Sequence, residues 1–269
     1  MNLIVGLMAT HPRETSLRNV SIPSIARQSR LPDALVIVSD TCRLPESAEK
    51  VLQALLPQTP IYSIPNLRAK GAAGAWNTGL HYIHQYWPNA YVAILDDDDT
   101  WDVDHLYTCW DVAKNDNWPD VVVSGLRMSK DGAVISRPPP ETLCVEDFLV
   151  GNPGWQGSNT FASISSLLKA GGFTDGLSSC NDRDLAIRVL GLPDTRISYT
   201  GTFTATWNLN ASPDCLSQVG LQKQEALKKF FALHGHRMSA EVKQRFLKRC
   251  KDLFGVSGGC QGSCRIFVV

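Results

Sequence analysis

Four consecutive aspartates, Asp96, Asp97, Asp98 and Asp99, follow the apolar run YVAIL at residues 91–95. The run predicts a buried strand, so the carboxylates lie at its carboxyl end, where open α/β sheets bind their ligands. Four adjacent like charges repel one another and require a counter-charge, and carboxylate oxygens favour Mg²⁺ or Mn²⁺ shared with substrate phosphates. The cluster therefore predicts a metal and nucleotide site. Helix capping explains one or two of these aspartates, but hardly four.

A second carboxylate pair, Asp182 and Asp184, lies just before the helical run at residues 185–190. A hydroxyl that attacks must lose its proton, and a carboxylate within hydrogen-bond reach can take it. Asp184 and Arg188 are four residues apart, which predicts an ion pair that orients the segment. Capping of the helix N-terminus is the alternative for Asp182, and the two roles are compatible.

Three polar residues follow the first two predicted strands. Thr10 and Arg13 come just after the first strand, and Asp40 comes just after the second. In a parallel sheet all three face the same crevice as the aspartates. Asp40 can accept a hydrogen bond from a base N–H or a ribose hydroxyl, and Arg13 can hold a base or a phosphate. An exposed cation at a helix start is the alternative for Arg13.

Two loops have compositions that suit substrate contacts. Arg68 and Lys70 precede the small residues 71–74, which allow a diphosphate to approach the backbone at a helix N-terminus; a solvated loop is the alternative. Trp155 and Gln156 lie in a polar, glycine-containing segment that suits a sugar or acceptor platform. Core packing of Trp155 is the alternative.

The elements that must position these residues alternate between apolar runs and helical stretches. In chain order they cover residues 3–7, 16–29, 34–39, 46–56, 61–64, 74–86 and 91–95. This alternation predicts a parallel sheet with crossover helices, and the continuous apolar runs predict helices on both faces. A helix at 104–115, a strand at 120–125 and a hairpin turning at residues 131–132 then predict a mixed α+β second half.

The C-terminal part predicts two amphipathic helices with a basic face, because residues 222–254 contain nine Lys and Arg against three Asp and Glu. A solvated face is one interpretation; an anionic substrate, a membrane surface or a partner is the other. Neither His234 nor His236 in this stretch is assigned to a metal. Cys260 and Cys264 lack further ligands for a zinc site, so a disulfide or free thiols are expected there.

Composition excludes several classes of protein. The chain has 269 residues, 43% of them hydrophobic, and its 26 Lys and Arg balance 26 Asp and Glu. A globular protein of one or two domains is expected, with no global charge that favours nucleic acid. No apolar segment is long enough for a membrane helix, and the N-terminus does not resemble a signal peptide. We therefore expect a cytoplasmic protein that can associate peripherally with the inner face of the membrane.

Several motifs, in order, resemble those of glycosyltransferase family 2, which has a GT-A fold and an Asp-x-Asp signature. Asp96-Asp97-Asp98 is similar to the signature, and residues 3–40 resemble the opening strand, Thr-containing loop, helix and second strand ending in Ser-Asp. RAKGAAGAWNTGL resembles the segment that ends in Ala-Arg-Asn-x-Gly. SSCNDRDLAIRVL resembles the acceptor-side Glu-Asp-x-Asp motif, with Asn181 in place of the glutamate. The resemblance covers roughly residues 1–210.

The resemblance implies a fold and a domain layout. The fold is an α/β, Rossmann-like GT-A sandwich of the nucleotide-diphospho-sugar transferases, with a mixed central sheet and C-terminal helices. We expect the glycosyltransferase domain at residues 1–215, divided into a nucleotide-binding half at 1–125 and an acceptor half at 126–215. The amphipathic helices follow at 216–254 and a flexible Gly/Cys tail at 255–269.

The resemblance also implies roles for individual residues. Asp98 and Asp96 bind Mn²⁺ or Mg²⁺, and Asp182 is the general base of an inverting sugar transfer. The residues that bind the nucleotide sugar are Thr10, Arg13, Asp40, Arg68, Lys70, Asn77, Asp96 and Asp97. Those that bind the acceptor are Trp155, Gln156 and Asp184. Asn77 shapes the site and takes no part in the chemistry.

The expected activity is therefore the metal-dependent transfer of a sugar from a nucleotide-diphosphate sugar to an acceptor hydroxyl. The donor expected from the family is a UDP-sugar. The acceptor is a glycan, a lipid-linked molecule or a peptide. A nucleotidyltransferase of the same fold is one alternative, although the loop after the first strand lacks the Gly-rich basic stretch that such an enzyme needs. A non-catalytic relative that binds a sugar nucleotide or a partner is the other, favoured by Asn181.

Overall fold

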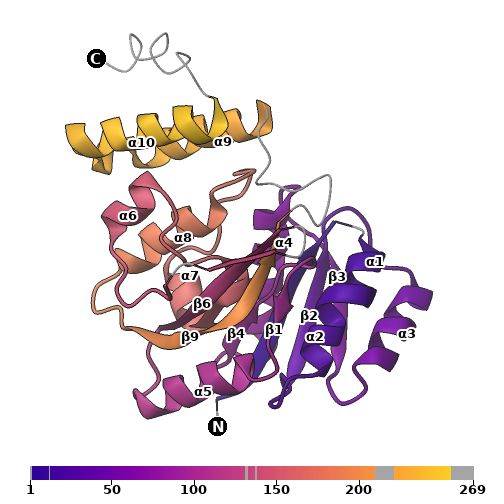
Figure 1. The fold of residues 1–269 in the computed structure, drawn as a ribbon. Helices are drawn as coiled ribbons and strands as arrows, with labels where there is room; N and C mark the ends of the chain where they lie inside the picture. Colours follow the sequence, from indigo (N-terminus) through magenta and orange to yellow (C-terminus); the bar gives the residue numbers. More distant parts are fainter. Residues whose placement is uncertain (1, 12, 131–132, 137, 210–220, 256–269) are drawn as a thin grey trace.

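The computed structural model describes residues 2–11, 13–130, 133–136, 138–209 and 221–255. Its centre is a sheet in the order β3-β2-β1-β4-β8-β6-β9-β5, with β7 paired to β6 (Figure 1). The strands are β1 (Ile4–Thr10), β2 (Ala34–Ser39), β3 (Ile61–Pro65), β4 (Tyr91–Ile94), β5 (Thr100–Trp101), β6 (Val121–Lys130), β7 (Ala133–Ser136), β8 (Thr160–Ser163) and β9 (Ile197–Asn208).

Helices cover both faces of this sheet. They are α1 (Glu14–Ser16), α2 (Ile22–Ala26), α3 (Glu46–Leu55), α4 (Ala72–Tyr86), α5 (His105–Asn115), α6 (Val145–Val150), α7 (Ile164–Lys169), α8 (Asn181–Leu190), α9 (Leu221–His234) and α10 (Ala240–Phe254). A π-helical turn, η1 (Leu17–Ser21), joins α1 to α2, and short 3-10 turns lie at η2 (Gly157–Asn159) and η3 (Gly235–Arg237). The first helix therefore ends at Ala26, earlier than the predicted residue 29.

The direction of the strands changes at β8. Strands β3, β2, β1 and β4 are parallel, as the alternation of strands and helices predicts. β8 is antiparallel to both β4 and β6, whereas β6 and β9 are parallel to each other. β6 and β7 form the predicted hairpin, with Lys130 opposite Ala133. The prediction of an α/β fold with a mixed central sheet is confirmed.

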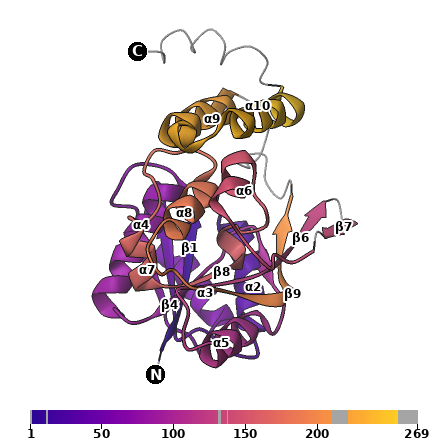
Figure 2. The same cartoon turned by 90° about the vertical axis from the view of Figure 1, so that its left-hand side faces the viewer.

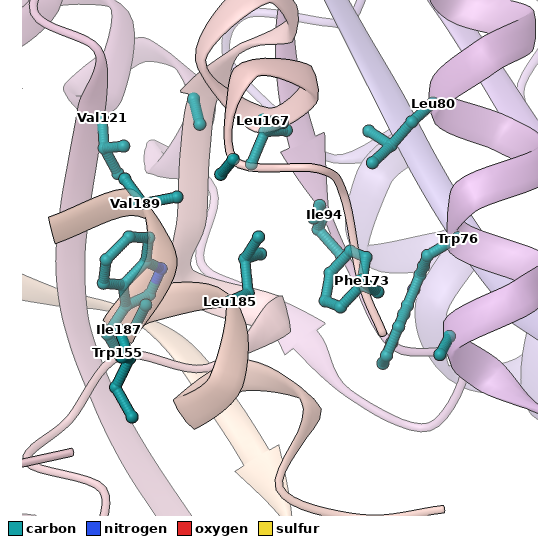
Figure 3. Close-up of a cluster of buried hydrophobic side chains, with 14 of the residues drawn as sticks. Trp76, Leu80, Ile94, Val121, Trp155, Leu167, Phe173, Leu185, Ile187 and Val189 are labelled. Carbon is teal, nitrogen blue, oxygen red and sulfur yellow. The ribbon is translucent and has the colours of Figure 1, made fainter. Parts of the chain in front are cut away.

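The core has two layers, one on each face of the sheet. On β1, Val5 and Leu7 face one layer while Ile4 and Met8 face the other. Successive strand residues point to opposite faces, so a strand covered on both sides needs apolar residues throughout. Figure 3 shows part of the first layer, where Trp76 and Phe173 pack with ring centroids 4.6 Å apart.

Close packing explains the small residues at the start of α4. A Cβ atom on Gly74 would lie 1.9 Å from the backbone oxygen of Ala69, and one on Gly79 would lie 2.2 Å from Leu7 Cδ1. Gly71, with φ of 120°, precedes the helix. Gly74 and Gly79 therefore bring α4 against its own loop and against β1, which is a packing requirement independent of any ligand.

The two predicted C-terminal helices are present and lie above α6 and α8 in both views (Figures 1 and 2). α10 begins after Ser239, whose side chain accepts a hydrogen bond from the N–H of Val242, and ends at Gly255 in the left-handed conformation. Phe230 and Phe246 stack between the helices at 6.1 Å and belong to the first core layer. Within the described residues, no helix is long and apolar enough to cross a bilayer. The predicted tail, with Cys260 and Cys264, lies outside the described residues.

Candidate active site

The aspartate run after β4 alternates between buried and open side chains. Asp97 and Asp99 are 2% and 1% exposed, whereas Asp96 and Asp98 are partly open to solvent. A turn over Asp97 and Asp98, closed by a hydrogen bond from the N–H of Asp99 to the backbone oxygen of Asp96 at 3.1 Å, sets these positions. The open pair consists of the two residues that the Asp-x-Asp resemblance assigns to a metal.

Asp99 holds the end of β4 to distant parts of the sheet. Its carboxylate accepts hydrogen bonds from Ser158 Oγ at 2.5 Å and from the backbone N–H of Asn208 at 2.9 Å. The Asn208 side chain donates to the backbone oxygen of Asp98 at 2.8 Å. Burial, followed by the charge of Asp98, raises the pKa of Asp99 to about 8. Asp99 therefore links the run to η2 and β9.

Thr10 and Arg13 reach the run from the end of β1. Thr10 Oγ1 donates to Asp97 at 2.6 Å, and the Arg13 guanidinium lies 3.5 Å from Asp97 and 2.7 Å from Asp98. Burial raises the pKa of Asp97 to about 6 against the opposing effects of Arg13 and Thr10. Because Thr10 and Asp97 are buried against each other, the predicted direct contacts of these two residues with a nucleotide are not supported. They position the run, while Arg13 lies half-buried at its rim.

The structure brings Asp182 to the aspartate run. A Cβ atom on Gly157 would lie 3.3 Å from Asp96 Oδ1, and the backbone N–H of Gly157 also interacts with Asp182. Burial and the charges of Asp99 and Asp182 raise the pKa of Asp96 well above its usual range. Burial likewise raises the pKa of Asp182 to about 6, against the Gly157 N–H and the charge of Lys223. Carboxylates from β4 and α8 thus meet at η2.

Asp40 closes the loop that follows β3. Its Oδ1 accepts hydrogen bonds from the backbone N–H of Gly71 at 2.7 Å and from Asn66 Nδ2 at 2.8 Å. Its Oδ2 lies 3.9 Å from the exposed His11 ring. One oxygen therefore shapes the loop, and Oδ2 is the atom that stays available for the predicted nucleotide contact.

Asn77 and Asp175 tie the start of α4 to a distant loop. Asn77 donates to the Phe173 backbone oxygen and to Asp175, both at 2.7 Å, and accepts from the Phe173 N–H at 2.8 Å. Asp175 also pairs with Arg68 at 2.9 Å. Asn77 is buried, which supports the site-shaping role and not direct nucleotide binding. Lys70 is exposed, so Arg68 and Lys70 both lie on the open side of this loop.

Trp155 belongs to the core. It is 2% exposed, its Nε1 donates to Thr160 Oγ1 at 2.7 Å, and its ring meets Phe148 edge-on at 6.1 Å. Figure 3 shows it within the apolar cluster. The structure supports the alternative of core packing, and the predicted contact of Trp155 with a sugar or acceptor is not supported. Gln156 is half-buried, and its acceptor contact stays a prediction.

Replacing Trp155 by alanine tests this placement. We expect the free energy of unfolding to fall by about 3–5 kcal/mol, the usual cost of removing a large buried aromatic side chain. Urea unfolding of the variant and the wild type measures the difference. Loss of less than about 1 kcal/mol would contradict a core position.

Asp184 has no free oxygen for an acceptor. Its carboxylate accepts from His234 Nε2 at 2.8 Å, from Arg188 at 2.6 Å and from Thr174 Oγ1 at 2.8 Å. Burial acts to raise the pKa of Asp184, but these hydrogen bonds outweigh it and hold the pKa at about 2. The predicted helical pair with Arg188 is present, whereas the predicted acceptor contact is not supported.

The roles of four residues at the site were not predicted from the sequence: Gly157, Ser158, Lys223 and His234. Gly157 and Ser158 lie in the segment that was expected to form an acceptor platform, and its glycine-serine pair was the available signal. Lys223 and His234 lie on α9, where the sequence shows only an amphipathic basic helix. Their link to Asp182 and Asp184 exists only in the folded chain.

The residues present fit a divalent cation that a diphosphate helps to bind. In the described part of the chain, no group of three or more His, Cys, Asp or Glu side chains is arranged to hold a metal alone. Asp96 and Asp98 are partly open to solvent, and burial, followed by the charges of Asp99 and Asp182, raises the pKa of Asp96. Mg²⁺ and Mn²⁺ are commonly held by one or two carboxylates plus substrate phosphates. Arg13 pairs with Asp98 and must shift if Asp98 takes a cation.

Comparisons with known proteins identify the family and the fold. The model of the family described as Glycosyl transferase family 2 matches residues 7–167. Among solved structures, S. aureus TarS 1–349 in complex with UDP-GlcNAc has a TM-score of 0.68 and 13% identity, covering 100% of this chain and 76% of that one.

The S. aureus TarS 1–349 complex with UDP has a TM-score of 0.63 and 15% identity over the same shares of the two chains. A longer S. aureus TarS structure has a TM-score of 0.63 and 14% identity, and 46% of its chain is covered. At these identities the similarity shows the fold. No curated protein matches the sequence.

Proposed function

Because the chain belongs to glycosyltransferase family 2 and is a glycosyltransferase that uses a nucleotide sugar, we propose that it moves a sugar from a UDP-sugar to an acceptor hydroxyl with inversion. The observation that carries this proposal is the meeting of Asp96, at the end of β4, with Asp182 of α8 at Gly157. The donor-side and acceptor-side carboxylates come from segments more than 80 residues apart, yet the fold brings them to one place.

Asp96 and Asp98 form the donor side of this mechanism. In the proposal they hold Mn²⁺ or Mg²⁺ against the diphosphate. When bound, the cation stabilises the negative charge that develops on the departing nucleoside diphosphate. Thr10, bonded to Asp97, and Ser158, bonded to Asp99, hold the run in place.

The rim groups bind the rest of the donor. Arg13 and Lys70 offer positive charge to the diphosphate, and Arg68 lines the same loop while Asp175 holds it. Asp40 Oδ2 accepts from the base or the ribose. UDP is the first nucleotide to test, because the S. aureus TarS structures hold UDP and UDP-GlcNAc.

Asp182 is the proposed base. Its pKa of about 6 makes it a stronger base than an ordinary aspartate, while most of it remains deprotonated at pH 7. It takes the proton of the acceptor hydroxyl as the oxygen attacks the anomeric carbon. One base and one leaving group on opposite sides of the sugar suit a single displacement, which inverts the configuration. The acceptor is a hydroxyl of a glycan, a lipid-linked molecule or a peptide.

A thermal-shift titration tests the donor site. UDP, GDP, TDP, CDP and ADP are each added with and without Mn²⁺. We expect UDP with Mn²⁺ to raise the melting temperature by roughly 5 °C at a hundredfold excess over Kd, since such binding adds about 2.7 kcal/mol to the stability. The other nucleotides, and UDP without Mn²⁺, should give smaller shifts.

Each other result of this titration points elsewhere. A shift with GDP or TDP in place of UDP would change the donor and leave the transferase mechanism standing. A full shift without Mn²⁺ would contradict metal dependence. No shift with any nucleotide would contradict the proposed donor site and favour a relative that binds a partner without catalysis.

We also propose that α9 and α10 contact an anionic lipid surface. Exposed cations such as Lys229 and Lys251 lie on these helices together with the exposed Leu247 and Leu253. We expect the protein to sediment with phosphatidylglycerol vesicles at low salt, and to be released as salt screens the charges. Phosphatidylcholine vesicles are the control. Equal binding to both, or none to either, would contradict an electrostatic contact.

A further inference from the structure

The first turn of helix α8 contains three consecutive charged residues, Asp182, Arg183 and Asp184, which have different surroundings. Asp182, the proposed base, is half-buried at the site, whereas Arg183 and Asp184 are buried and fully engaged in protein contacts. Buried charges are rarely kept without specific partners, because removing them from water is costly. The partners of Arg183 and Asp184 therefore show what holds this turn of the helix in place.

Arg183 anchors the turn to α6 and α9. Its Nε donates to the Phe148 backbone oxygen at 2.8 Å, and its Nη2 donates to that of Leu149 at 3.0 Å. Its guanidinium carbon lies 4.1 Å from the centre of the Phe230 ring. These contacts satisfy the last carbonyls of α6 and place a cation on an aromatic face. The residue directly after the base is thus fixed by α6 on one side and α9 on the other.

Asp184 anchors the turn to α9 a second time. His234, which is 4% exposed, lies with Nε2 2.8 Å from Asp184 Oδ1, and its Nδ1 is buried with no hydrogen-bond partner among the described residues. A carboxylate only accepts, so Nε2 carries the hydrogen. Among the described residues, the hydrogen bond to Asp184 is therefore the one that this buried ring makes.

A third contact runs along the same helix. Lys223 Nζ donates to Ser179 Oγ at 2.6 Å, in the loop that leads into α8. Figures 1 and 2 both show α9 and α10 stacked on α6 and α8. The segment that matches the family model ends at residue 167, so α9 lies beyond it.

We propose that His234 is a positioning residue for catalysis: by holding Asp184, it fixes the rotation of the first turn of α8 and so the direction in which Asp182 faces the acceptor. The C-terminal helices are then part of the catalytic apparatus. This inference rests on the proposed function, because it assumes that Asp182 is the base. A displacement of about 1 Å in a reacting group costs about a hundredfold in rate, so a single hydrogen bond at this point can have a large effect.

The test measures UDP release from UDP-GlcNAc in Mn²⁺ for a set of full-length variants. His234→Leu replaces the imidazole ring by an apolar side chain of similar size and so removes the hydrogen bond to Asp184. We expect its kcat to fall about a hundredfold while the UDP dissociation constant stays within twofold of wild type. His234→Gln, whose amide can still donate to Asp184, should recover much of the loss. His236→Gln, at an exposed histidine two residues away, is the matched control and should equal wild type.

A double-mutant cycle separates positioning of Asp182 from general damage. If His234 acts through the base, Asp182→Asn and Asp182→Asn/His234→Leu should release UDP at the same rate. Additive losses, or a His234→Leu kcat within twofold of wild type, would overturn the inference. If His234→Leu does not fold, Asp184→Asn replaces it in the cycle with the same two outcomes. A wild-type protein that neither binds UDP nor releases it from UDP-GlcNAc contradicts the proposed function instead.

Discussion

Replacing Asp182 by asparagine is expected to lower the turnover of sugar transfer by about a thousandfold, within the range of about 10² to 10⁴ that a general base contributes. The substitution keeps the size of the side chain and removes its ability to take a proton. Because Asp182 does not hold the nucleotide in the proposed mechanism, the UDP dissociation constant should change little. Steady-state kinetics and calorimetric titration of UDP measure the two effects separately.

The pH dependence of the wild type checks the same assignment. Burial raises the pKa of Asp182 to about 6, and a base acts only when deprotonated. The rate of transfer should therefore decline as the pH drops below about 6 and level off above it. Asp194→Asn, at an exposed turn, is the matched control and should keep wild-type turnover. Unchanged transfer in Asp182→Asn would show that another group is the base.

Replacing Asp98 by alanine should abolish the part of UDP binding that depends on Mn²⁺ and reduce turnover by about 10² to 10³, as removal of one stabilising group at a developing charge commonly does. Asp98 is partly open, and its cationic neighbour in this structure is Arg13 at 2.7 Å. Loss of its carboxylate removes a ligand of the proposed cation and leaves the rest of the run in place. Thermal shifts with UDP, with and without Mn²⁺, give the direct measurement.

The control for Asp98 is Asp104→Ala, which removes an exposed carboxylate just before α5. It should keep the full Mn²⁺-dependent shift. Direct Mn²⁺ binding, followed by electron paramagnetic resonance in the presence of UDP, gives a second readout besides activity. If Asp98→Ala binds Mn²⁺ and UDP as the wild type does, the proposed metal ligand is wrong.

The gathering of residues at one sheet edge could be predicted from the sequence. Apolar runs marked β1, β2 and β4, and parallel strands necessarily bring their carboxyl ends together. This rule alone placed Arg13 and Asp40 near the aspartate run. The alternation of buried and partly open aspartates arises from a turn, closed by the Asp99 N–H on the Asp96 backbone oxygen, which was not predicted from the sequence.

The roles of individual side chains at that edge were harder to predict. Thr10 and Asp97 have residue types that suit a ligand, but each serves as the partner of the other. The residues next to Trp155 in the sequence are compatible both with a ring that stacks on a sugar and with a ring that packs in the core. Only the folded structure shows that the ring packs against Phe148. Local sequence therefore predicted which segments meet at this edge, but it could not separate side chains that are open to a ligand from those that support them.

Contacts across long stretches of chain left no signal at all. His234 and Asp184 are 50 residues apart, and the helical pattern around His234 only marks one face of α9 as buried. A histidine on a buried helix face fits this amphipathic pattern whether or not it has a polar partner, so the pattern does not identify the partner. The pairing became visible only when the two helices were seen packed together.

The dependence of α8 on α9 has a consequence for biosynthesis. A ribosome that has just added Asp184 must add 50 more residues to reach His234, which takes roughly 3–10 s at 5–20 residues per second. Once Asn208 at the end of β9 has been added, the sheet and the aspartate run can fold, while Arg183 and Asp184 still lack their partners on α9. The aspartate run can therefore reach its folded geometry before the turn that carries the proposed base is anchored to α9.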